Sequence, residues 1–347
     1  MDHRRMRAAV FHGPGDVRLT DVPTPKLREG DVLVRVTAAG ICGSDVNRYR
    51  YGSQPWPPPF IMGHEFCGEI ADVGAGVSEW KVGEQVVVQP TLSCGACFYC
   101  RSGHENLCVE FVRRGLTGSG TDGGFAEYVR VPAYQPHACP AELTPEIATL
   151  VEPTAVSVHG LRLADVDTLD TVLVVGIGNI GLLAILAAHA GGARRIVAVG
   201  KYPLRQELAR RYGAAVVLGP DDPRLRERIV EETDGLGAEV ALEAAGTPSS
   251  LRTAIAGARK GGRIVVLGVI REEVPLDYRG ILMNEKHILG SIIYQRRDFA
   301  DAIEILTRWG VDPRHITVTI PLDDIVTRGF VPLTERPADF VKVRVAT

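Results

Sequence analysis

The sequence predicts an α/β protein that joins a β-rich domain to a domain built on a doubly wound parallel sheet. Three observations support this fold class: short β-branched runs fill residues 7–150, apolar strands alternate with amphipathic helices from about residue 156, and a β-like run closes the chain. A length of 347 residues is sufficient for two domains with sizeable cores. We therefore expect a discontinuous first domain over 1–155 and 292–347, and a second domain over 156–291.

The first domain is expected to consist mainly of strands. Its strand candidates are short, rich in β-branched residues and separated by Gly or Pro; they are RAAVF, DVLVRVTAAG, GEIADVG, EQVVVQP and FAEYVRVP. After about residue 290 we expect a helix at RDFADAIEILTRW and then the tail FVKVRVA. Because this tail resembles the first segment in composition, we expect it to return to the first domain.

The second domain is expected to alternate strands and helices. The strand candidates are TVLVV, RIVAV, AVVL, EVALEA and RIVVLGV, and helical patterns such as PLRQELARRYG, PRLRERIVEET and SSLRTAIAGARK lie between them. This alternation predicts a parallel sheet with helices on both faces. Residues 171–193 carry no Asp, Glu, Lys or Arg, but Gly176, Gly178 and Gly181 interrupt the apolar run, so a strand, a turn and a buried helix explain it better than a membrane span.

Charge and composition exclude several classes of partner. Lys and Arg number 39 against 42 for Asp and Glu, which gives a formal net charge of −3 and no general attraction for nucleic acid or an acidic membrane. The N-terminal MDHRRMRAAVF is basic but lacks the apolar run of a secretory signal. We therefore expect a cytoplasmic protein with neither a nucleic-acid nor a membrane partner.

Four of the seven cysteines form a candidate metal site. Cys94, Cys97, Cys100 and Cys108 follow the spacing C-x2-C-x2-C-x7-C. Four thiolates in one loop can surround a tetrahedral zinc and leave no open coordination position, so such a site orders the loop and does no chemistry. An iron–sulfur cluster and four unrelated thiols are the alternatives.

The stretch VVGIGNIG predicts a dinucleotide site of the Rossmann type. It fits G-x-G-x-x-G with Gly176, Gly178 and Gly181, follows a strand and opens a helix, which is the context that makes this motif informative. The turn, including Asn179 and Ile180, would present helix amides to a pyrophosphate.

The next strand ends without the acid that usually binds the adenosine ribose of NAD. Gly200 occupies that position, which we interpret as space without charge. It is followed by the cations Lys201 and Arg205 and by Tyr202, which supplies a hydroxyl. That set suits a 2′-phosphate and predicts a preference for NADP(H) over NAD(H). The alternative is that the cations are only a solvated helix face and that the cofactor is NAD.

A second metal site is suggested by GICGSD, GHEF and TLVEPTAV, which hold Cys42, His64, Glu65 and Glu152. Taken singly, each residue has an ordinary structural explanation, as a core thiol, a core histidine or a helix-capping carboxylate. Together with the cysteine loop, GGFAEYV and VEPTAVSVHGL, however, these motifs resemble the zinc-dependent medium-chain dehydrogenases. Within that superfamily the chain is similar to the polyol branch of butanediol, sorbitol and threonine dehydrogenases.

The resemblance implies a GroES-like catalytic domain, a Rossmann cofactor domain and two zinc ions per chain. Cys42, His64 and Glu152 would hold the catalytic zinc, Glu65 would exchange with water in its shell, and Ser44 would take the substrate hydroxyl's proton. The four loop cysteines would hold the structural zinc. GKYPLR also resembles the Gly-Ser-Arg-Pro stretch of NADP-dependent members. Where relatives commonly have a histidine, this chain has Asn47, which does not titrate near neutrality, so the route of the proton to solvent is open.

The leading hypothesis is a zinc-dependent oxidoreductase that moves a hydride between a secondary alcohol, vicinal diol or polyol and NADP(H). Its partner would be a small alcohol or ketone, and the resemblance implies a homodimer or homotetramer. The alternatives are an NAD-dependent polyol or butanediol-type dehydrogenase, a biosynthetic dehydrogenase for a larger cyclitol or natural-product alcohol, and, more remotely, a non-catalytic nucleotide-binding protein. Zinc-free quinone or enoyl reductases share the fold but lack these metal-binding residues.

Overall fold

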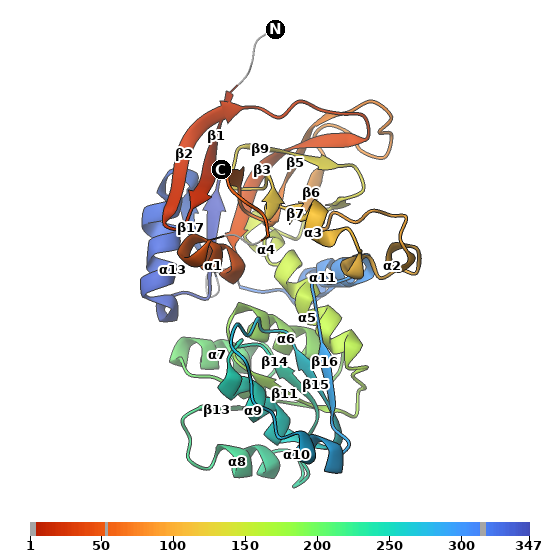
Figure 1. Ribbon diagram of the computed structural model, residues 1–347, viewed down its shortest axis with the longest axis vertical. Helices are drawn as coiled ribbons and strands as arrows, with labels where there is room; N and C mark the ends of the chain where they lie inside the picture. The colour runs from red at the N-terminus through yellow and green to blue at the C-terminus, as the bar shows by residue number, and fades with distance from the viewer. Residues whose placement is uncertain (1–4, 53–54, 313–316) are drawn as a thin grey trace. The chain divides into compact units, whose positions relative to one another are not determined.

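The computed structural model describes residues 5–52, 55–312 and 317–347. The chain divides into two compact units: unit 1 takes in the chain up to Glu152 and again from Gln295, and unit 2 covers Pro153–Tyr294. Figure 1 shows antiparallel strands in unit 1 and alternating strands and helices in unit 2. The predicted fold class is confirmed.

Unit 1 is built on β-sheets. One has three strands in the order β2-β1-β4, a larger one has the order β10-β6-β5-β3-β18-β17 with β9 also paired to β3, and β7 and β8 form a small pair. The strands are β1 (Arg5–Gly13), β2 (Asp16–Pro23), β3 (Asp31–Ile41), β4 (Phe60–Ile61), β5 (Glu65–Val73), β6 (Gln85–Val88), β7 (Leu116–Thr117), β8 (Gly120–Thr121), β9 (Tyr128–Pro132), β10 (Pro136–Ala138), β17 (Thr317–Pro321) and β18 (Lys342–Ala346).

The helices of unit 1 are short, apart from α11. They are α1 (Gly43–Tyr51), α2 (Phe98–Arg101), η1 (Glu105–Leu107), α3 (Phe111–Arg114), α4 (Pro145–Ala148), α11 (Arg296–Trp309), η2 (Leu322–Asp324), η3 (Ile325–Phe330), α13 (Val331–Glu335) and η4 (Pro337–Asp339), while α5 (Val151–Leu163) begins at the end of the first segment.

Strand β3 organises the larger sheet because it pairs with β5, β9 and β18. Its alternating residues Val32, Val34 and Val36 are buried in the core, as the period of a strand requires. On the opposite face, Arg35 forms an ion pair with Glu69 at 2.8 Å, directly across the β3–β5 register. The pairing of β18 with β3 brings the C-terminal segment back into unit 1.

Unit 2 contains a six-stranded parallel sheet in the order β13-β12-β11-β14-β15-β16, which is the strand order of a doubly wound dinucleotide fold. Its elements are β11 (Thr171–Val175), α6 (Asn179–Ala190), β12 (Arg195–Val199), α7 (Pro203–Arg211), β13 (Val216–Leu218), α8 (Leu225–Glu231), β14 (Ala238–Glu243), α9 (Pro248–Gly257), β15 (Ala258–Val266), α10 (Tyr278–Met283) and β16 (His287–Gly290). Strand β11 is buried along its whole length, as expected for a central strand covered on both faces.

The helix expected over SSLRTAIAGARK is shorter than predicted. It ends at Gly257, and the following residues belong to β15. A side chain at position 257 would press against Leu173 at 2.5 Å, so a glycine is needed where the helix meets the sheet. Lys286 then donates to the carbonyls of Ile255 and Ala258 and satisfies acceptors at the end of the helix.

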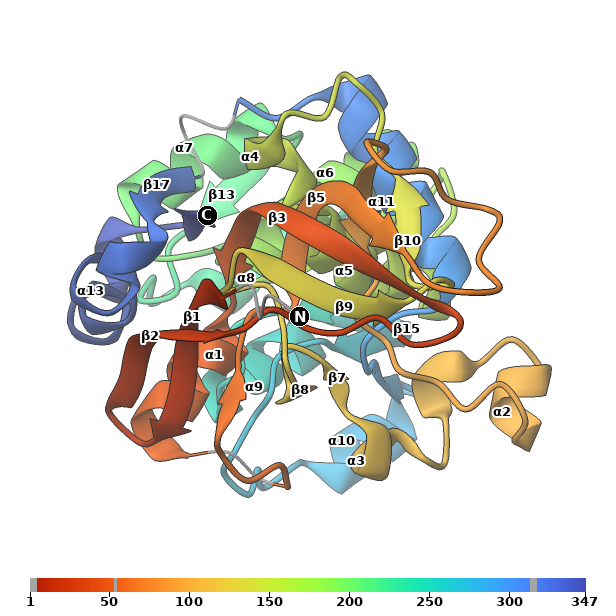
Figure 2. The same ribbon diagram turned by 90° about the horizontal axis from the view of Figure 1, so that it is seen from above.

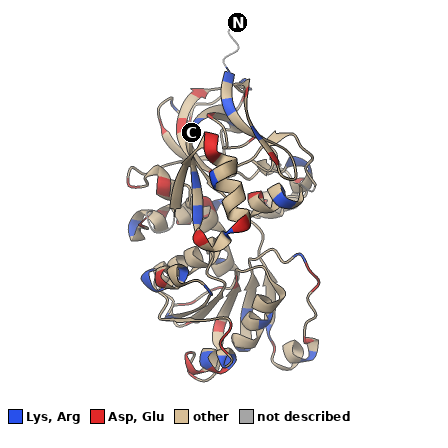
Figure 3. Ribbon diagram, turned by 90° about the vertical axis from the view of Figure 1, so that its left-hand side faces the viewer, with Lys and Arg blue, Asp and Glu red and all other residues tan. Residues whose placement is uncertain are grey.

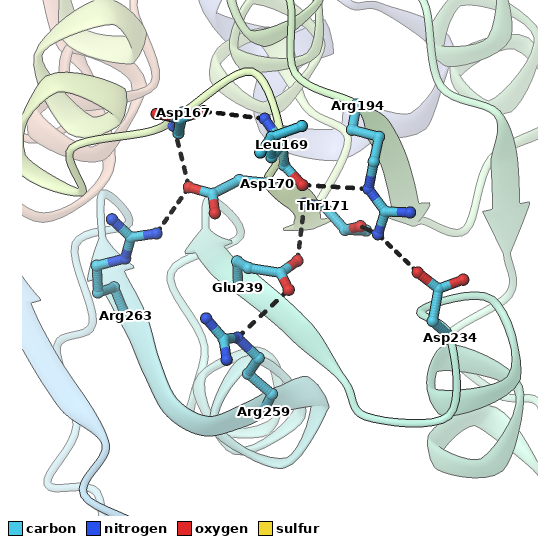
Figure 4. A network of polar contacts seen from close by, with 9 residues as sticks. All are labelled: Asp167, Leu169, Asp170, Thr171, Arg194, Asp234, Glu239, Arg259 and Arg263. Atoms are coloured by element: carbon cyan, nitrogen blue, oxygen red, sulfur yellow. Dashed lines mark hydrogen bonds and ion pairs between the residues drawn. The ribbon is translucent and has the colours of Figure 1, made fainter.

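A polar network ties together the amino ends of the parallel strands (Figure 4). Arg263 pairs with Asp170 at 2.6 Å, and Arg194 pairs with Asp234 at 2.7 Å while it also donates to Thr171. This edge of the sheet lies opposite the carboxyl ends of the strands, where doubly wound folds bind ligands. The network therefore supports the sheet without occupying its binding edge.

None of the helices described in 5–52, 55–312 and 317–347 is long and apolar enough to cross a membrane. Basic and acidic residues are interspersed along the ribbon of each unit (Figure 3), in keeping with the small net charge.

His137 on β10 anchors helix α11 to the sheet of unit 1. Its ring centroid lies 4.8 Å from that of Phe299, and its Nε2 lies 3.1 Å from Oε1 of Gln89. Burial, with a further contribution from the positive charge of Arg296, lowers the pKa of His137 to about 4. The ring is therefore neutral in the folded protein over most of the accessible pH range.

Acidification should destabilise the protein through His137. The unfolded histidine takes up a proton near pH 6.5 and the folded one only near pH 4, so stability falls as the pH drops through this window. Relative to a His137→Gln variant, the wild type should lose about 1–2 kcal/mol more of its unfolding free energy between pH 7 and pH 5. Urea unfolding of both zinc-loaded proteins at each pH measures this difference, and equal losses would contradict it.

Candidate metal centres and cofactor site

The four loop cysteines converge on one point. The ligand atoms of Cys94, Cys97, Cys100 and Cys108 all lie within 4.8 Å of one another, and the sulfurs of Cys94 and Cys100 are 3.8 Å apart. In a tetrahedral site with Zn–S bonds of about 2.3 Å, neighbouring sulfurs lie about 3.8 Å apart. All seven cysteines of the chain are free thiols. The donor set therefore fits one closed zinc site.

Backbone amides prepare two of these thiols to bind a cation. The Cys97 amide donates to the Cys94 sulfur at 3.3 Å, and the Cys100 amide donates to the Cys97 sulfur at 3.4 Å. Hydrogen bonds from the amides of Cys100 and Val109 lower the pKa of Cys97 to about 6, whereas desolvation and the Cys97 thiol raise the pKa of Cys100 to about 12. A dication would favour the thiolate form of every member.

The cysteine loop needs such support because few sheet contacts hold it. Figures 1 and 2 show the segment around α2 at the margin of unit 1, away from the strands. Phe98 at its centre is 72% exposed. One tie to the rest of unit 1 is Glu105, which accepts a hydrogen bond from the backbone amide of Arg296 at the start of α11. A metal that joins four points of the loop would order it.

A second donor set gathers at the start of α1 and β5. The ligand atoms of Cys42, His64 and Glu65 lie within 4.8 Å of one another. Cys42 caps α1, while His64 directly precedes β5 and Glu65 begins it. The antiparallel pairing of β3 with β5 places Gly40, two residues before Cys42, opposite Glu65. A thiolate, an imidazole and a carboxylate are donors that zinc accepts, so the set fits this metal.

Asp45 places a buried carboxylate beside His64 and was not predicted from the sequence. Its Oδ1 lies 3.6 Å from Nδ1 of His64, at ion-pair distance but beyond a hydrogen bond, and its Oδ2 accepts from the Cys42 amide at 3.0 Å. Desolvation would lower the pKa of His64, but the charges of Asp45 and Cys42 outweigh it and raise that pKa well above its usual value. The signal in the sequence is an acid at the third helical position after Cys42, which completes a capping box.

Lys342 neutralises Glu65 and was also missed. Its ammonium forms an ion pair with Oε2 of Glu65, and the two side chains are only 3% and 1% exposed. Desolvation lowers the pKa of Lys342, but the negative charges of Glu65 and Cys42 outweigh it and raise that pKa above its usual value. A side chain at Gly40 would come within 2.8 Å of Lys342 Cε, so this glycine makes room for the pair. The only signal in the sequence is a lysine within the apolar tail FVKVRVA.

Glu152 and Ser44 lie beside this donor set rather than within it. Glu152, near the start of α5, is 7% exposed and is not one of the mutually close donors. Its charge contributes to raising the pKa of Lys342, which places it in the same neighbourhood. Ser44 is exposed, and its amide donates to the Cys42 sulfur at 3.5 Å. The structure thus gathers three of the four expected ligands and leaves Ser44 accessible next to them.

The glycine turn in unit 2 has the geometry of a dinucleotide site. Gly176 adopts φ +99°, and a side chain there would lie 2.6 Å from Ala245. A side chain at Gly181 would overlap with the carbonyl oxygen of Gly176, so the first turn of α6 can pack on the loop only with glycine. Gly178 faces open space and caps α6, whose first residues are Asn179 and Ile180. The backbone amides at the start of α6 fit a pyrophosphate.

Glu243 is a further residue at this edge that the sequence did not reveal. It is fully buried at the end of β14, in register with Val175 just before the glycine turn. Its Oε1 accepts from the amides of Ala245 and Gly246 at 2.8 and 2.7 Å and from Ser250 at 2.6 Å. Glu243 therefore holds the loop that packs against Gly176. The signal was a single acid at the end of the apolar run EVALEA.

The interpretation of Gly200 as empty space is wrong. A Cβ built there would overlap with Cγ1 and Cδ1 of Ile177, which fill the volume. Two cationic side chains follow at the start of α7. The Arg205 guanidinium lies 4.9 Å from the ring centroid of Tyr202, and Nζ of Lys201 lies 3.9 Å from Oδ2 of Asp221. Desolvation lowers the pKa of Arg205.

Comparison with known proteins gives consistent matches over most of the chain. The model of the alcohol dehydrogenase GroES-like domain matches residues 28–141, and that of the zinc-binding dehydrogenase matches 179–308. Sorbitol dehydrogenase of Bacillus subtilis (strain 168) is 36% identical over 319 residues, which cover 90% of this chain and 89% of that protein. The crystal structure of 2R,3R-butanediol dehydrogenase from Bacillus subtilis has a TM-score of 0.89 and 32% identity and covers 99% of both chains. A zinc-binding dehydrogenase from Sinorhizobium meliloti 1021, solved bound to NADP, has a TM-score of 0.89 and 31% identity and covers 99% of this chain and 100% of its own.

Replacing Lys342 by Met should destabilise the protein strongly, because the buried carboxylate of Glu65 would lose its ammonium partner. We expect a loss of about 3–5 kcal/mol in the unfolding free energy, most of which the double variant Lys342→Met/Glu65→Gln should recover. Denaturant unfolding of the zinc-loaded proteins measures both effects. Lys81→Met, at an exposed lysine, is the matched control and should unfold like the wild type. Equal stability of the single and double variants would show that the pair is not coupled.

Proposed function

We propose that this chain, which belongs to the zinc-dependent medium-chain alcohol dehydrogenases of the sorbitol, butanediol and threonine dehydrogenase branch, transfers a hydride between a secondary alcohol and NADP(H). Membership of this family makes it an oxidoreductase that acts on CH–OH groups and uses zinc and a nicotinamide cofactor. The observation that carries the proposal is the convergence of Cys42, His64 and Glu65 beside the exposed hydroxyl of Ser44. We propose vicinal diols and polyols as the substrate class, after the relatives named above.

Two zinc ions per chain are part of the proposal. Cys94, Cys97, Cys100 and Cys108 would hold the structural ion, and Cys42 and His64 would hold the catalytic one with Glu152, with Glu65 as an exchanging neighbour. A zinc ion, when bound, supplies a Lewis acid that lowers the pKa of an alcohol hydroxyl and polarises a carbonyl.

The chain's own residues prepare this chemistry. Asp45 places a negative charge beside the His64 ring, and Lys342 balances the charge of Glu65. Ser44, exposed next to Cys42, takes the proton of the substrate hydroxyl and passes it on, since a serine is not a terminal base. Asn47 does not titrate, so that proton leaves through ordered water or a cofactor hydroxyl.

The preference for NADP(H) rests on the residues after β12. The position that an acid would need for the ribose hydroxyls of NAD carries Gly200, and the cations of Lys201 and Arg205 follow it. The guanidinium of Arg205 is partly desolvated against Tyr202, which strengthens its attraction for a phosphate dianion. The solved relative from Sinorhizobium meliloti is bound to NADP.

We also propose that two copies of this chain associate through unit 2. Strand β16 ends the parallel sheet, and among the described residues no strand pairs with its outer edge. Apolar side chains around it are at least half exposed; they are Val269, Tyr278, Leu282, Met283 and Ile292. An open sheet edge flanked by apolar side chains is a surface that proteins usually cover, and an identical edge would suit it.

The function is tested by oxidation of a panel of vicinal diols and polyols, with NAD and NADP supplied separately and the zinc content measured in the same samples. We expect two zinc ions per chain and a kcat/KM for a small diol roughly tenfold or more higher with NADP, because one well-placed cation–phosphate contact contributes about that factor. Turnover with NAD alone would keep the enzyme class and refute the cofactor preference. Protein without zinc would refute both metal sites.

Association through β16 is tested by the double variant Leu282→Glu/Met283→Glu. Two carboxylates on this surface should prevent its burial, so in size-exclusion chromatography with light scattering the variant should have half the mass of the wild-type dimer or tetramer. Leu169→Glu is the control, since Leu169 is 75% exposed and lies in the network at the amino ends of the strands. A double variant with the same mass as the wild type would place the interface elsewhere.

A further inference from the structure

Gly200 and Ile177 form one packed unit at the carboxyl edge of the parallel sheet. Gly200 directly follows β12, and Ile177 lies in the glycine turn between Gly176 and Gly178. Ile177 is 3% exposed, and any side chain at position 200 would begin inside the volume of its Cγ1 and Cδ1 atoms, with its Cβ only 3.1 Å away. The glycine at 200 is therefore required by the isoleucine at 177.

Neither partner can move away easily. Isoleucine carries two γ carbons, so rotation about χ1 tends to replace one obstructing carbon by the other, and burial limits the rotation further. The backbone of Gly200 is held at both polar atoms: its amide donates to the carbonyl of Leu218 at 3.0 Å, and its carbonyl accepts from the side chain of Gln206 at 2.8 Å. A larger residue at 200 must therefore displace the Ile177 side chain, the turn or the strand.

We propose that Ile177 is a positioning residue for nucleotide preference: its side chain restricts position 200 to glycine and so excludes an acidic ribose-binding residue from the end of β12. This inference rests on the proposed use of a nicotinamide dinucleotide and deepens it. In folds of this class a carboxylate at that position accepts from both ribose hydroxyls and repels a 2′-phosphate. Ile177 keeps this position free of any side chain, so the cations of Lys201 and Arg205 act without an opposing acid at 200.

The proposal predicts a specific dependence between two substitutions. Gly200→Asp alone should damage the site, since the new carboxylate collides with Ile177. Ile177→Ala removes the obstructing carbons and should by itself leave the preference for a 2′-phosphate in place. Only the double variant Ile177→Ala/Gly200→Asp should gain an acceptor for unmodified ribose, so the two effects should be strongly non-additive.

The experiment uses the zinc-loaded full chain and measures binding rather than turnover. Calorimetric titration with 2′,5′-ADP and with 5′-AMP gives the two dissociation constants for the wild type, both single variants and the double variant, and thermal unfolding is recorded for each protein. Gly219→Asp is the matched control: it adds a carboxylate after the neighbouring strand β13, where a Cβ meets no atom within 4 Å, and should unfold like the wild type.

Three results are expected together. Gly200→Asp should unfold at a clearly lower temperature and bind both nucleotides about tenfold or more weakly, as a distorted site does. The double variant should regain most of the lost unfolding temperature. Its ratio of affinities for 5′-AMP and 2′,5′-ADP should also shift by about a hundredfold toward 5′-AMP, because the negative carboxylate of Asp at position 200 would repel the negative 2′-phosphate.

The proposal is overturned if Gly200→Asp alone unfolds like the wild type and binds 5′-AMP as tightly as the double variant does. It is also overturned if the double variant recovers neither stability nor binding. A wild type that binds 5′-AMP more tightly than 2′,5′-ADP would refute the proposed NADP preference instead. In that case the unfolding temperatures of Gly200→Asp and of the double variant, and the shift in the ratio of nucleotide affinities, would still test whether Gly200→Asp requires Ile177→Ala.

Discussion

The site in unit 1 depends on the compensation of buried negative charge. A zinc centre needs anionic donors, and here Cys42, Glu65 and Asp45 are gathered in a region from which water is largely excluded. Such a group is stable only if cations or a metal face it. Lys342 and Arg48 supply that charge from the protein, at Glu65 and Asp45 respectively. The candidate metal ligands are therefore embedded in a network of protein charges.

This network explains why the first unit needs its C-terminal segment. Strand β18 pairs with β3, and its register sets Val343 opposite Ile41 and Arg344 opposite Gly40. Lys342, at the start of the same strand, is thereby carried to the Glu65 side of the sheet. Without β18 the carboxylate of Glu65 would lose its counter-charge. The discontinuity of unit 1 is thus part of how the candidate metal site is built.

The sequence predicted what is encoded locally and missed what depends on long-range register. The cysteine loop, the glycine turn and the alternation of unit 2 are each contained within a short window, where spacing reflects geometry directly. Asp45 and Glu243 are acids whose partners are visible only once helix caps and strand ends are placed. Lys342 is 277 positions from Glu65 in the chain (342 minus 65), so no periodicity could have joined them. The resemblance to known dehydrogenases supplied the ligand set that spacing alone did not.

Gly200 shows how a missing residue can be misread from sequence. The sequence suggests that Gly200 leaves space without charge, whereas the volume is filled by an isoleucine from the preceding turn. Both interpretations are compatible with the proposed preference for NADP. In the first, the preference would depend on the residue at position 200 alone. In the second, it would depend on the packing of Ile177 in the glycine turn against Gly200 at the end of β12. A cofactor preference encoded in packing resists single substitutions, because each change must first fit its neighbour. Close backbone approach at Gly176, Gly181 and Gly200 is the common constraint at this edge, and it limits which side chains the site can acquire.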